Sequence, residues 1–411
     1  MSADGVENAF GIGHEYYRLL EDNEIILPGS NNAKGFYFIR GWGSDLLDAL
    51  VKHFEASISI SPEVTSRSPK LVVNSDLYDG EVAGFGGFDG VFRLNWFGSQ
   101  CVLRPDAALG GLRELVGRLG DGNPRDTLAV FQGFRNVKGG TPTLFRDRFI
   151  YPFVQYNRLV KTSDVGTETE GAIGALVGFF DSLGIPVRVL DFGPWKNYAK
   201  RLFAIVSHSK TGSPTILSMF FIVGDIYREL AGIPDAYEAF DIGITEKVLG
   251  FCVLLHRANG LQFPSSISPA QVVVQGDFGD FGDLPRDKQL RIVFTDLPQE
   301  EAFRVWIRRR GVPLLLTKGR RSTRIFSRSR RWEDFHGSFD LAGLLKREDN
   351  ALTEAAMARL DESANPSLFL PEGEKADDAQ GIKIISQSPS LVAMKATRQL
   401  RQAWPEGRTF Y

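Results

Sequence analysis

Apolar residues recur at helical spacing in three segments of this chain. The first segment follows Ser44, which is expected to cap a helix over residues 45–55. Its apolar stripe consists of Leu46, Leu47, Leu50, Val51 and Phe54. Segments 107–119 and 168–183 repeat the spacing, and a glycine, the residue that commonly terminates a helix, follows each. The pattern predicts three amphipathic helices.

Shorter apolar and β-branched runs lie between and after these helices. They predict strands over residues 70–73, 99–103, 127–134, 149–156, 187–190, 202–207 and 216–223. The apolar run 250–256 is interpreted as a further strand. No segment repeats with a period of about 20 to 50 residues, which argues against a solenoid.

The pattern changes after Pro269. Strands predicted over residues 271–275, 290–295 and 312–317 alternate with a helix over 299–310. Such alternation is typical of a small α/β domain with adjacent parallel strands. A domain boundary is therefore expected near residues 265–269, and a helix over 352–360 with a mixed tail completes the chain.

The composition is that of an ordinary globular protein, with one local exception, a basic segment over residues 304–331. The 411 residues are 43% apolar and 24% charged, which excludes wholesale disorder and a coiled coil. The net charge of −2 argues against a protein that coats nucleic acid or membrane over its whole surface. Between Arg304 and Arg331, however, there are eleven basic residues and no acidic one. A basic module is therefore expected within an otherwise acidic chain.

The cysteines and the apolar runs indicate the compartment. Cys101 and Cys252 are too few for a disulfide framework or a four-thiolate metal site. The first ten residues lack the pattern of a signal peptide, and the most apolar stretch, 215–224, is about half the length that spans a bilayer. We expect a soluble cytoplasmic protein with no membrane partner.

Familiar chemical motifs are missing. The five histidines are scattered, so no metal site is expected, and no nucleophile elbow, Walker loop or dinucleotide fingerprint is present. The glycine cluster over residues 84–87 could cradle a phosphate, but strand-like residues follow it. Turns and bulges are the favoured interpretation of this cluster.

Five segments carry motifs in a fixed order. They are residues 102–106 (VLRPD), 134–136 (FRN), 146–148 (RDR), 243–250 (GITEKVLG) and 267–274 (ISPAQVVV). In this order they resemble five parts of the class II aminoacyl-tRNA synthetases, most closely the prolyl-tRNA synthetases. Those parts are the "LRPT" segment, the start and end of motif 2, motif 3, and the first strand of the anticodon-binding domain. Motif 1, a dimer-forming helix and strand, would fall on residues 45–73 with Pro69 as its proline.

The resemblance implies an α+β fold. A class II synthetase-like antiparallel sheet flanked by helices would be followed by an α/β anticodon-binding-like domain and a small C-terminal extension. The implied divisions are an N-terminal segment (1–34), the catalytic-type domain (35–266), the anticodon-binding-like domain (267–349) and the extension (350–411). The third is expected to be truncated, because only the loop 276–288 separates its first two strands.

The resemblance also implies an ATP site, with Mg²⁺ accompanying the nucleotide. Arg135 would contact the α-phosphate and act in catalysis with Lys247, while Arg146 or Arg148 would contact the outer phosphates. Such a site works by placing charge and by positioning the reactants. The implied substrate-binding residues are Asp106, Gln155, Met219, Phe220, Phe221 and Glu246. Alternatively, these arginines merely pair with surface carboxylates.

Several positions depart from the family pattern. Lys247 replaces an arginine and loses the planar fork that grips a phosphate. Val137 replaces the glutamate that would read adenine, and Asp106 and Ala108 replace a threonine and a glutamate near the amino acid. The stretch Met219–Phe221 replaces Thr-Ser-His. Each lost hydrogen-bond partner costs about 1–3 kcal/mol, so efficient prolyl-adenylate formation is not expected.

Three hypotheses remain open. The first is a repurposed ATP-dependent carboxylate-activating ligase of specialised metabolism, a homodimer with an apolar pocket in which Asp106 receives an amine. Its acceptor would be a small amine, a carrier protein or an RNA at the basic module. The second is a catalytically inactive scaffold that serves as a regulatory subunit. The third is a nucleic-acid-binding protein, in which Trp306, Phe326 and Trp332 stack on bases beside the arginines.

Overall fold

A computed structural model describes the arrangement of most of the chain. The described residues are 13–27, 36–58, 64–67, 72–74, 91–96, 98–119, 126–136, 142–145, 147–195, 198–208, 214–257, 260–276, 290–318, 322–327, 332–335, 340–363, 375–377 and 382–387. Within this part, no helix is long and apolar enough to cross a membrane.

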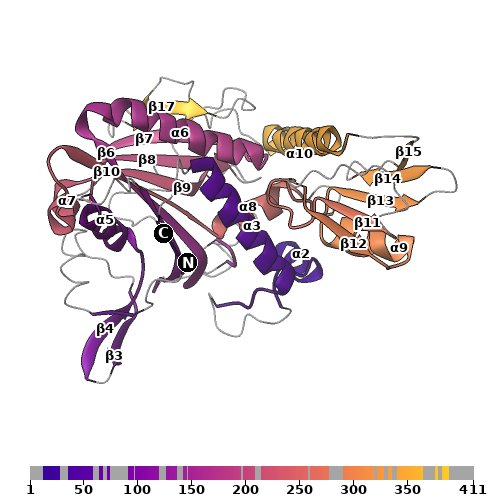
Figure 1. Cartoon of the computed structure of the whole chain (residues 1–411), viewed down its shortest axis with the longest axis horizontal. Helices are drawn as coiled ribbons and strands as arrows, with labels where there is room; N and C mark the ends of the chain where they lie inside the picture. The colour runs from indigo at the N-terminus through magenta and orange to yellow at the C-terminus, as the bar shows by residue number, and fades with distance from the viewer. Residues whose placement is uncertain are drawn as a thin grey trace.

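A sheet of nine strands forms the centre of the larger unit (Figure 1). Six antiparallel strands make up most of it, in the order β5 (Asp126–Phe134), β6 (Phe149–Lys161), β10 (Tyr237–Thr245), β9 (Pro214–Val223), β8 (Ala199–His208) and β7 (Arg188–Trp195). β1 (Val64–Arg67) pairs parallel with β5, and β17 (Ile382–Gln387) and β16 (Lys375–Asp377) extend the other edge. The expected antiparallel sheet is confirmed.

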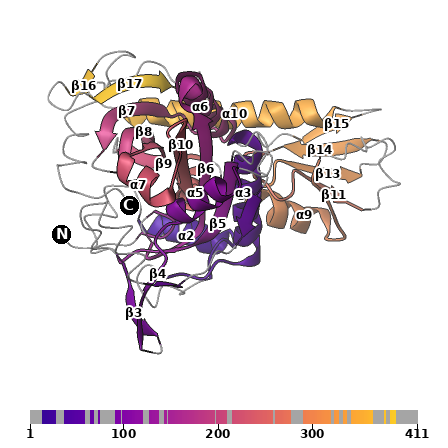
Figure 2. The ribbon, with the colours of Figure 1, turned by 60° about the vertical axis from the view of Figure 1, so that its left-hand side comes forward.

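Helices cover the two faces of this sheet differently. α3 (Gly41–Ile58), α6 (Val165–Ser182), α8 (Lys247–Leu255) and α2 (His14–Asp22) share a large apolar core with one face. Figure 2 shows α3 and α6 beside the sheet. Among the described helices, α5 (Ala108–Gly117) and the short α7 (Asp225–Ala231) pack on the opposite face, over a smaller core. Successive side chains of a strand point to opposite faces, so one residue packs in the large core and the next lies on the α5 face. Fewer of the described helices lie on the α5 face than on the α3 face.

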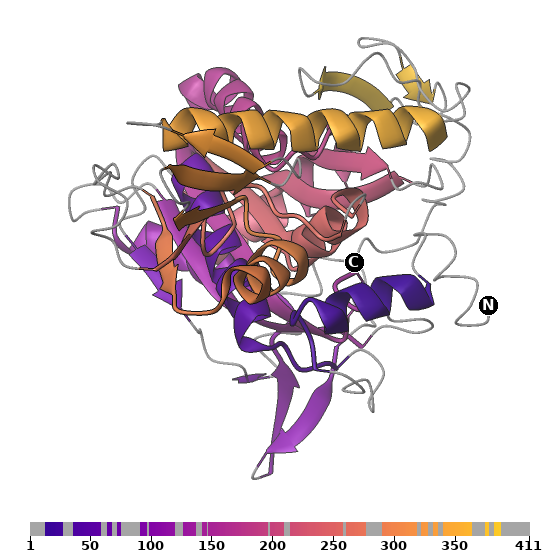
Figure 3. The ribbon, with the colours of Figure 1, turned by 90° about the vertical axis from the view of Figure 1, so that its right-hand side faces the viewer.

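The second unit is a five-stranded sheet in the order β12 (Ile292–Thr295), β11 (Val272–Gln275), β13 (Leu314–Lys318), β14 (Thr323–Ser327), β15 (Trp332–Phe335). β12, β11 and β13 are parallel, as predicted, and β14 and β15 add an antiparallel hairpin that the sequence did not predict. α9 (Gln299–Ala302) and the π-helical turn η3 (Phe303–Arg309) follow β12. The start of the long α10 (Leu341–Ser363) covers the sheet (Figure 3).

A third, small sheet projects from the larger unit. It consists of β2 (Val72–Asn74), β4 (Ser99–Leu103) and β3 (Arg93–Trp96), and its hairpin extends away from the body of the protein (Figure 1). Trp96 lies at the end of β3 and is 56% exposed.

Three predicted elements were wrong in kind or extent. Residues 250–256 belong to helix α8, because a short run that is apolar on every side fits a buried helix as well as a strand; residues 248–255 are all buried. α3 begins at Gly41 rather than after Ser44, whose N–H donates to the Arg40 carbonyl. α10 begins eleven residues before the predicted 352, at Leu341, and runs across the expected boundary at 349/350.

Candidate functional site

Three cationic residues gather at one end of the central sheet. β5 ends at Phe134, β6 begins at Phe149 and β10 ends at Thr245, all at the same edge. Arg135 therefore follows β5, Arg148 precedes β6, and Lys247 begins α8. The Arg135 N–H donates to the Arg148 carbonyl at 2.9 Å, and the Arg135 guanidinium lies 5.8 Å from the centre of the Phe153 ring. We call Arg135, Arg148 and Lys247 the cation edge.

Successive rows of side chains on the α5 face lead away from the cation edge. The strand register defines three rows. The first row contains Phe131, Phe153 and Thr245. The second contains Ala129, Gln155, Gly243 and Met219, and the third contains Thr127, Asn157, Asp241 and Phe221. Rows on one face are about 6.6 Å apart, so the third row lies about 13 Å from the first. Small residues, Ala129 and Gly243, occupy two places in the middle row.

Asp241 lies at the floor of the third row and was not predicted. Its carboxylate accepts hydrogen bonds from the Tyr198 hydroxyl, from Asn157 Nδ2 at 3.0 Å and from Gln155 Nε2 at 3.4 Å. Its side chain is buried among these three neutral donors. Burial, with a smaller contribution from the charge of nearby Asp106, raises the pKa of Asp241 to about 7, although the hydrogen bonds from its three donors lower it. Asp241 thus changes charge near neutral pH.

Asp106 and Gln155, both predicted substrate residues, adjoin this network. Gln155 Oε1 accepts the Ala107 N–H at 2.6 Å, which fastens the start of α5 to the sheet. The Asp106 carboxylate accepts the Ala108 N–H at 3.3 Å and is half-buried. No ion pair to Asp106 or Asp241 is found among the described residues. Arg104 Nη1 donates to the backbone carbonyl of Asp106 at 3.4 Å, so the described part of the chain places a guanidinium beside Asp106 but no ion pair on either carboxylate.

Two predicted substrate residues lie on the other side of the sheet. Met219 and Phe221 are on the α5 face, but Phe220 is fully buried against Phe203 and Phe240 in the helix-covered core. Glu246 continues the alternation of Ile242 and Ile244 and is buried on the helix side, beside α2. The prediction failed because three consecutive strand residues cannot share one face. Arg146, Val137 and the glycine cluster lie outside the described residues.

Contacts between the two units form a second region of interest. Glu24 accepts ion pairs from Arg309 and Arg310, both at 3.1 Å, and from Arg40 at 3.7 Å. The Arg310 guanidinium also lies 4.5 Å from the Trp306 ring centre and 5.3 Å from that of Trp42. We call Glu24 with these arginines and indoles the latch. It fastens η3 of the second unit to the N-terminal part of the first.

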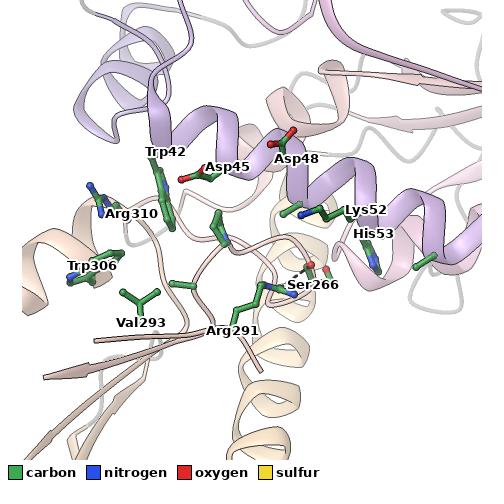
Figure 4. A pocket seen from close by; sticks show the side chains of 14 residues that line it. Trp42, Asp45, Asp48, Lys52, His53, Ser266, Arg291, Val293, Trp306 and Arg310 are labelled. Atoms are coloured by element: carbon green, nitrogen blue, oxygen red, sulfur yellow. Dashed lines mark hydrogen bonds between the residues drawn. The ribbon is translucent and has the colours of Figure 1, made fainter. Parts of the chain in front are cut away.

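A cavity of about 600 Å³ opens beside the latch, between α3 and the second unit (Figure 4). Asp45, Asp48 and Lys52 of α3 line it, and Arg291 lies opposite. The Arg291 guanidinium is already engaged, since it donates to the carbonyls of Ser265, Ser266 and Ser268. Burial lowers the pKa of His53 to about 4, so this lining residue is neutral at pH 7. These contacts serve the interface between the units.

Much of the basic module has intramolecular partners. Apart from Arg309 and Arg310, Arg304 pairs with Glu301 at 3.3 Å and Arg324 with Asp334 at 3.2 Å. Arg308 lies over the Phe303 ring. Among the described residues, no group of three or more His, Cys, Asp or Glu side chains is arranged to hold a metal ion.

Comparison with known proteins defines the class of fold. No protein-family model matches the sequence, and no curated protein matches it. Solved structures do match: the chain has the fold of the class II aminoacyl-tRNA synthetases, as its motifs predicted.

The matching structures include two prolyl-tRNA synthetases. The one from Giardia lamblia, solved with prolyl-adenylate, has a TM-score of 0.71 at 15% identity over 88% of this chain and 83% of its own. The one from Cryptosporidium parvum, solved with halofuginone and AMPPNP, has a TM-score of 0.66 at 17% identity over 88% and 80% of the two chains. At these identities the likeness concerns the fold.

Proposed function

We propose that this protein is an ATP-dependent carboxylate-activating ligase built on a divergent prolyl-tRNA-synthetase-like scaffold, and that it acts in specialised metabolism rather than translation. One observation carries the proposal: opposite charges lie at different levels of one sheet, with the cation edge at the strand ends and Asp241 in the third row, about 13 Å from the first row, with Asp106 near it. A substrate with an amine and a carboxylate matches this polarity.

ATP is the proposed source of activation. Arg135, Arg148 and Lys247 supply three positive charges at one edge, which suits a polyphosphate and stabilises charge that develops during transfer. The binding of AMPPNP by the similar Cryptosporidium enzyme supports this assignment. Mg²⁺ would be held largely by phosphate oxygens, as it often is in nucleotide sites.

The substrate is proposed to be a hydrophobic or aromatic amino acid. Met219 and Phe221 supply an apolar wall, and the small residues Ala129 and Gly243 share the row of Met219. The ammonium group would neutralise the paired carboxyls Asp106 and Asp241. Such burial of opposite charges discriminates strongly against acids that lack the amine, because the carboxyls would then be left unpaired.

Pyrophosphate exchange tests the proposal directly. The chain is assayed with a panel of acids, each amine-bearing acid being matched with its des-amino counterpart. Exchange that requires the amine supports the ligase. If no acid promotes exchange and ATP gives no thermal shift, the ligase proposal fails.

A second candidate is a catalytically inactive scaffold with a regulatory role. It is supported by Lys247 in place of an arginine and by the apolar wall of Met219 and Phe221. A homodimer through α3 and β1, the motif 1-like region, is proposed for either function. An RNA or carrier protein at the basic module is the proposed acceptor, although the internal partners of Arg309 and Arg310 leave fewer free charges there.

A further inference from the structure

Two buried carboxyl groups lie directly behind the cation edge. Asp147 immediately precedes Arg148, and Glu246 immediately precedes Lys247; each is 2% exposed. Asp147 Oδ1 and Glu246 Oε2 have no hydrogen-bond partner in the part of the chain that is described. A buried carboxylate oxygen without a partner is costly. The two groups therefore cannot both be ionised without a large penalty.

The remaining contacts connect the pair to several elements. Asp147 Oδ2 accepts the Leu144 N–H at 2.7 Å and a hydrogen bond from the Tyr37 hydroxyl, and Glu246 accepts the Tyr151 N–H. Tyr16 of α2 donates to the Thr143 carbonyl at 3.1 Å. The titratable and charged groups that face the pair are Tyr16, Tyr37 and Lys247, and Tyr17 and Arg257 lie near Tyr16 in turn.

The electrostatics favour retention of a proton by the pair. Burial is the largest cause for both groups: it raises the pKa of Glu246 to about 8 and raises that of Asp147 well above its ordinary value. The charge of Glu246 raises the pKa of Asp147 further, whereas the ammonium of Lys247 lowers both. Lys247 thus compensates part of one negative charge.

We propose that Asp147 and Glu246 share one proton at neutral pH and act as positioning residues, a clamp that holds the segment before Arg148 against the first turn of α8. The clamp fixes the spacing of two members of the cation edge. Loss of the proton to solvent leaves two like charges in one buried place, and they repel. The consequence for ATP rests on the proposed function; the shared proton itself does not.

The sign of the pH dependence follows from proton binding. The folded chain keeps a proton that an unfolded glutamate releases near its ordinary pKa of 4.5. Stability therefore falls as the pH rises from about 4.5 to about 8, by up to about tenfold in the folding equilibrium per pH unit for each retained proton. Above that window the full penalty is present.

The first test is denaturation of the full chain between pH 5 and pH 9. The wild type is expected to lose stability through this window, whereas Glu246→Gln flattens the loss and is the more stable chain at pH 9. Asp147→Asn provides a second neutral variant if the first does not fold. Glu229→Gln, the same change at an exposed position of α7, should follow the wild type. Identical pH profiles for wild type and both clamp variants overturn the shared proton.

The second test measures AMPPNP affinity against pH. Between pH 7 and pH 9 the wild type should weaken by about tenfold, the change expected for one proton over one pH unit, and Glu246→Gln should change by less than about twofold. If the pair has a structural role alone, Glu246→Gln should change stability but leave the dependence of AMPPNP affinity on pH as in the wild type. That result would contradict the positioning role. If added K⁺ or Mg²⁺ stabilises the wild type but not the variants, a bound cation and not a shared proton neutralises the pair, and the shared proton is overturned. Absence of AMPPNP binding at every pH refutes both the ATP site and the positioning role, and the denaturation data still decide the shared proton.

Discussion

Glu24 in the latch is partly buried and Asp241 on the sheet face is fully buried; both carboxyl groups have several partners, but the partners differ in charge. Arginines surround Glu24, so its charge is balanced within the chain. Asp241 receives hydrogen bonds from a tyrosine, an asparagine and a glutamine, and its charged neighbour is a second acid. Balanced charge in the latch fastens two units together, whereas a buried carboxyl group whose described partners are neutral suits a cationic ligand.

The largest effect is expected when Arg135 is removed from the cation edge. Arg135→Ala should lower pyrophosphate exchange by about 100- to 1,000-fold, because a preorganised charge at the reacting phosphate is lost. Exchange rates at saturating acid measure the effect. Arg118→Ala removes an exposed arginine paired with Glu114 on α5 and is expected to leave exchange unchanged. Equal loss of exchange in the two variants would contradict a role for Arg135 at the reacting phosphate.

Asp241→Asn keeps the shape of the network but removes its charge. Activity with amine-bearing acids should fall by about 10- to 100-fold, since a hydrogen bond to a charged group contributes about 1.5–3 kcal/mol. Activity with des-amino acids should not fall.

The pH profile provides a second readout at this residue. The wild type should lose affinity for amines as the pH falls through about 7, where Asp241 takes up a proton, and Asp241→Asn should not. A profile common to both chains would place the amine elsewhere.

A glycine in α5 tests how tightly the floor is packed. A Cβ at Gly111 would lie 2.3 Å from Asn157 Oδ1, the residue that donates to Asp241. Gly111→Ala should therefore lower the free energy of unfolding by about 1–3 kcal/mol, as overpacking does. Gly110 meets nothing within 4 Å, so Gly110→Ala should stabilise the helix by up to about 1 kcal/mol. Urea denaturation measures both; destabilisation of equal size would contradict the packing.

The smallest effect is expected at the latch. Glu24→Gln should cost about 1 kcal/mol, because Arg309 and Arg310 are partly exposed and solvent screens the pairs. The loss should shrink at high salt, and pyrophosphate exchange should be retained. Urea denaturation at two salt concentrations measures it. Glu301→Gln, which removes only the exposed pair with Arg304, is the control; a larger loss there would reverse the ranking.

Local patterns predicted the elements with a clear polar and apolar side. α3, α5, α6 and the β5–β6 pair were predicted because only one side of each is apolar or because β-branched residues cluster. β10 was missed: its glutamate, aspartate and glycine break the apolar pattern, although Asp241 between Phe240 and Ile242 is itself a signal of a polar group facing a site. β14 and β15 were hidden by the arginine-rich composition around them.

The site was predictable only where a motif supplied positions. Arg135, Arg148 and Lys247 followed from the resemblance, and the strand ends bring them to one edge. The partners of Asp241 and Glu24 were not predictable, because Tyr198 and Arg310 approach them from distant parts of the chain. Phe220 illustrates a different failure: its residue type fits a pocket, but the parity of the strand excludes it.

The pairing of β17 with β7 makes the second unit an insertion rather than an appendage. The chain leaves the central sheet after β10 and α8, builds the five-stranded sheet, and returns along α10 to add two strands to the sheet it left (Figure 3). Truncation after residue 266 would consequently strip β7 of its outer neighbour and expose a new sheet edge, a known route to aggregation. Excision of the second unit would instead leave two chain ends in the first unit, and these would have to be rejoined.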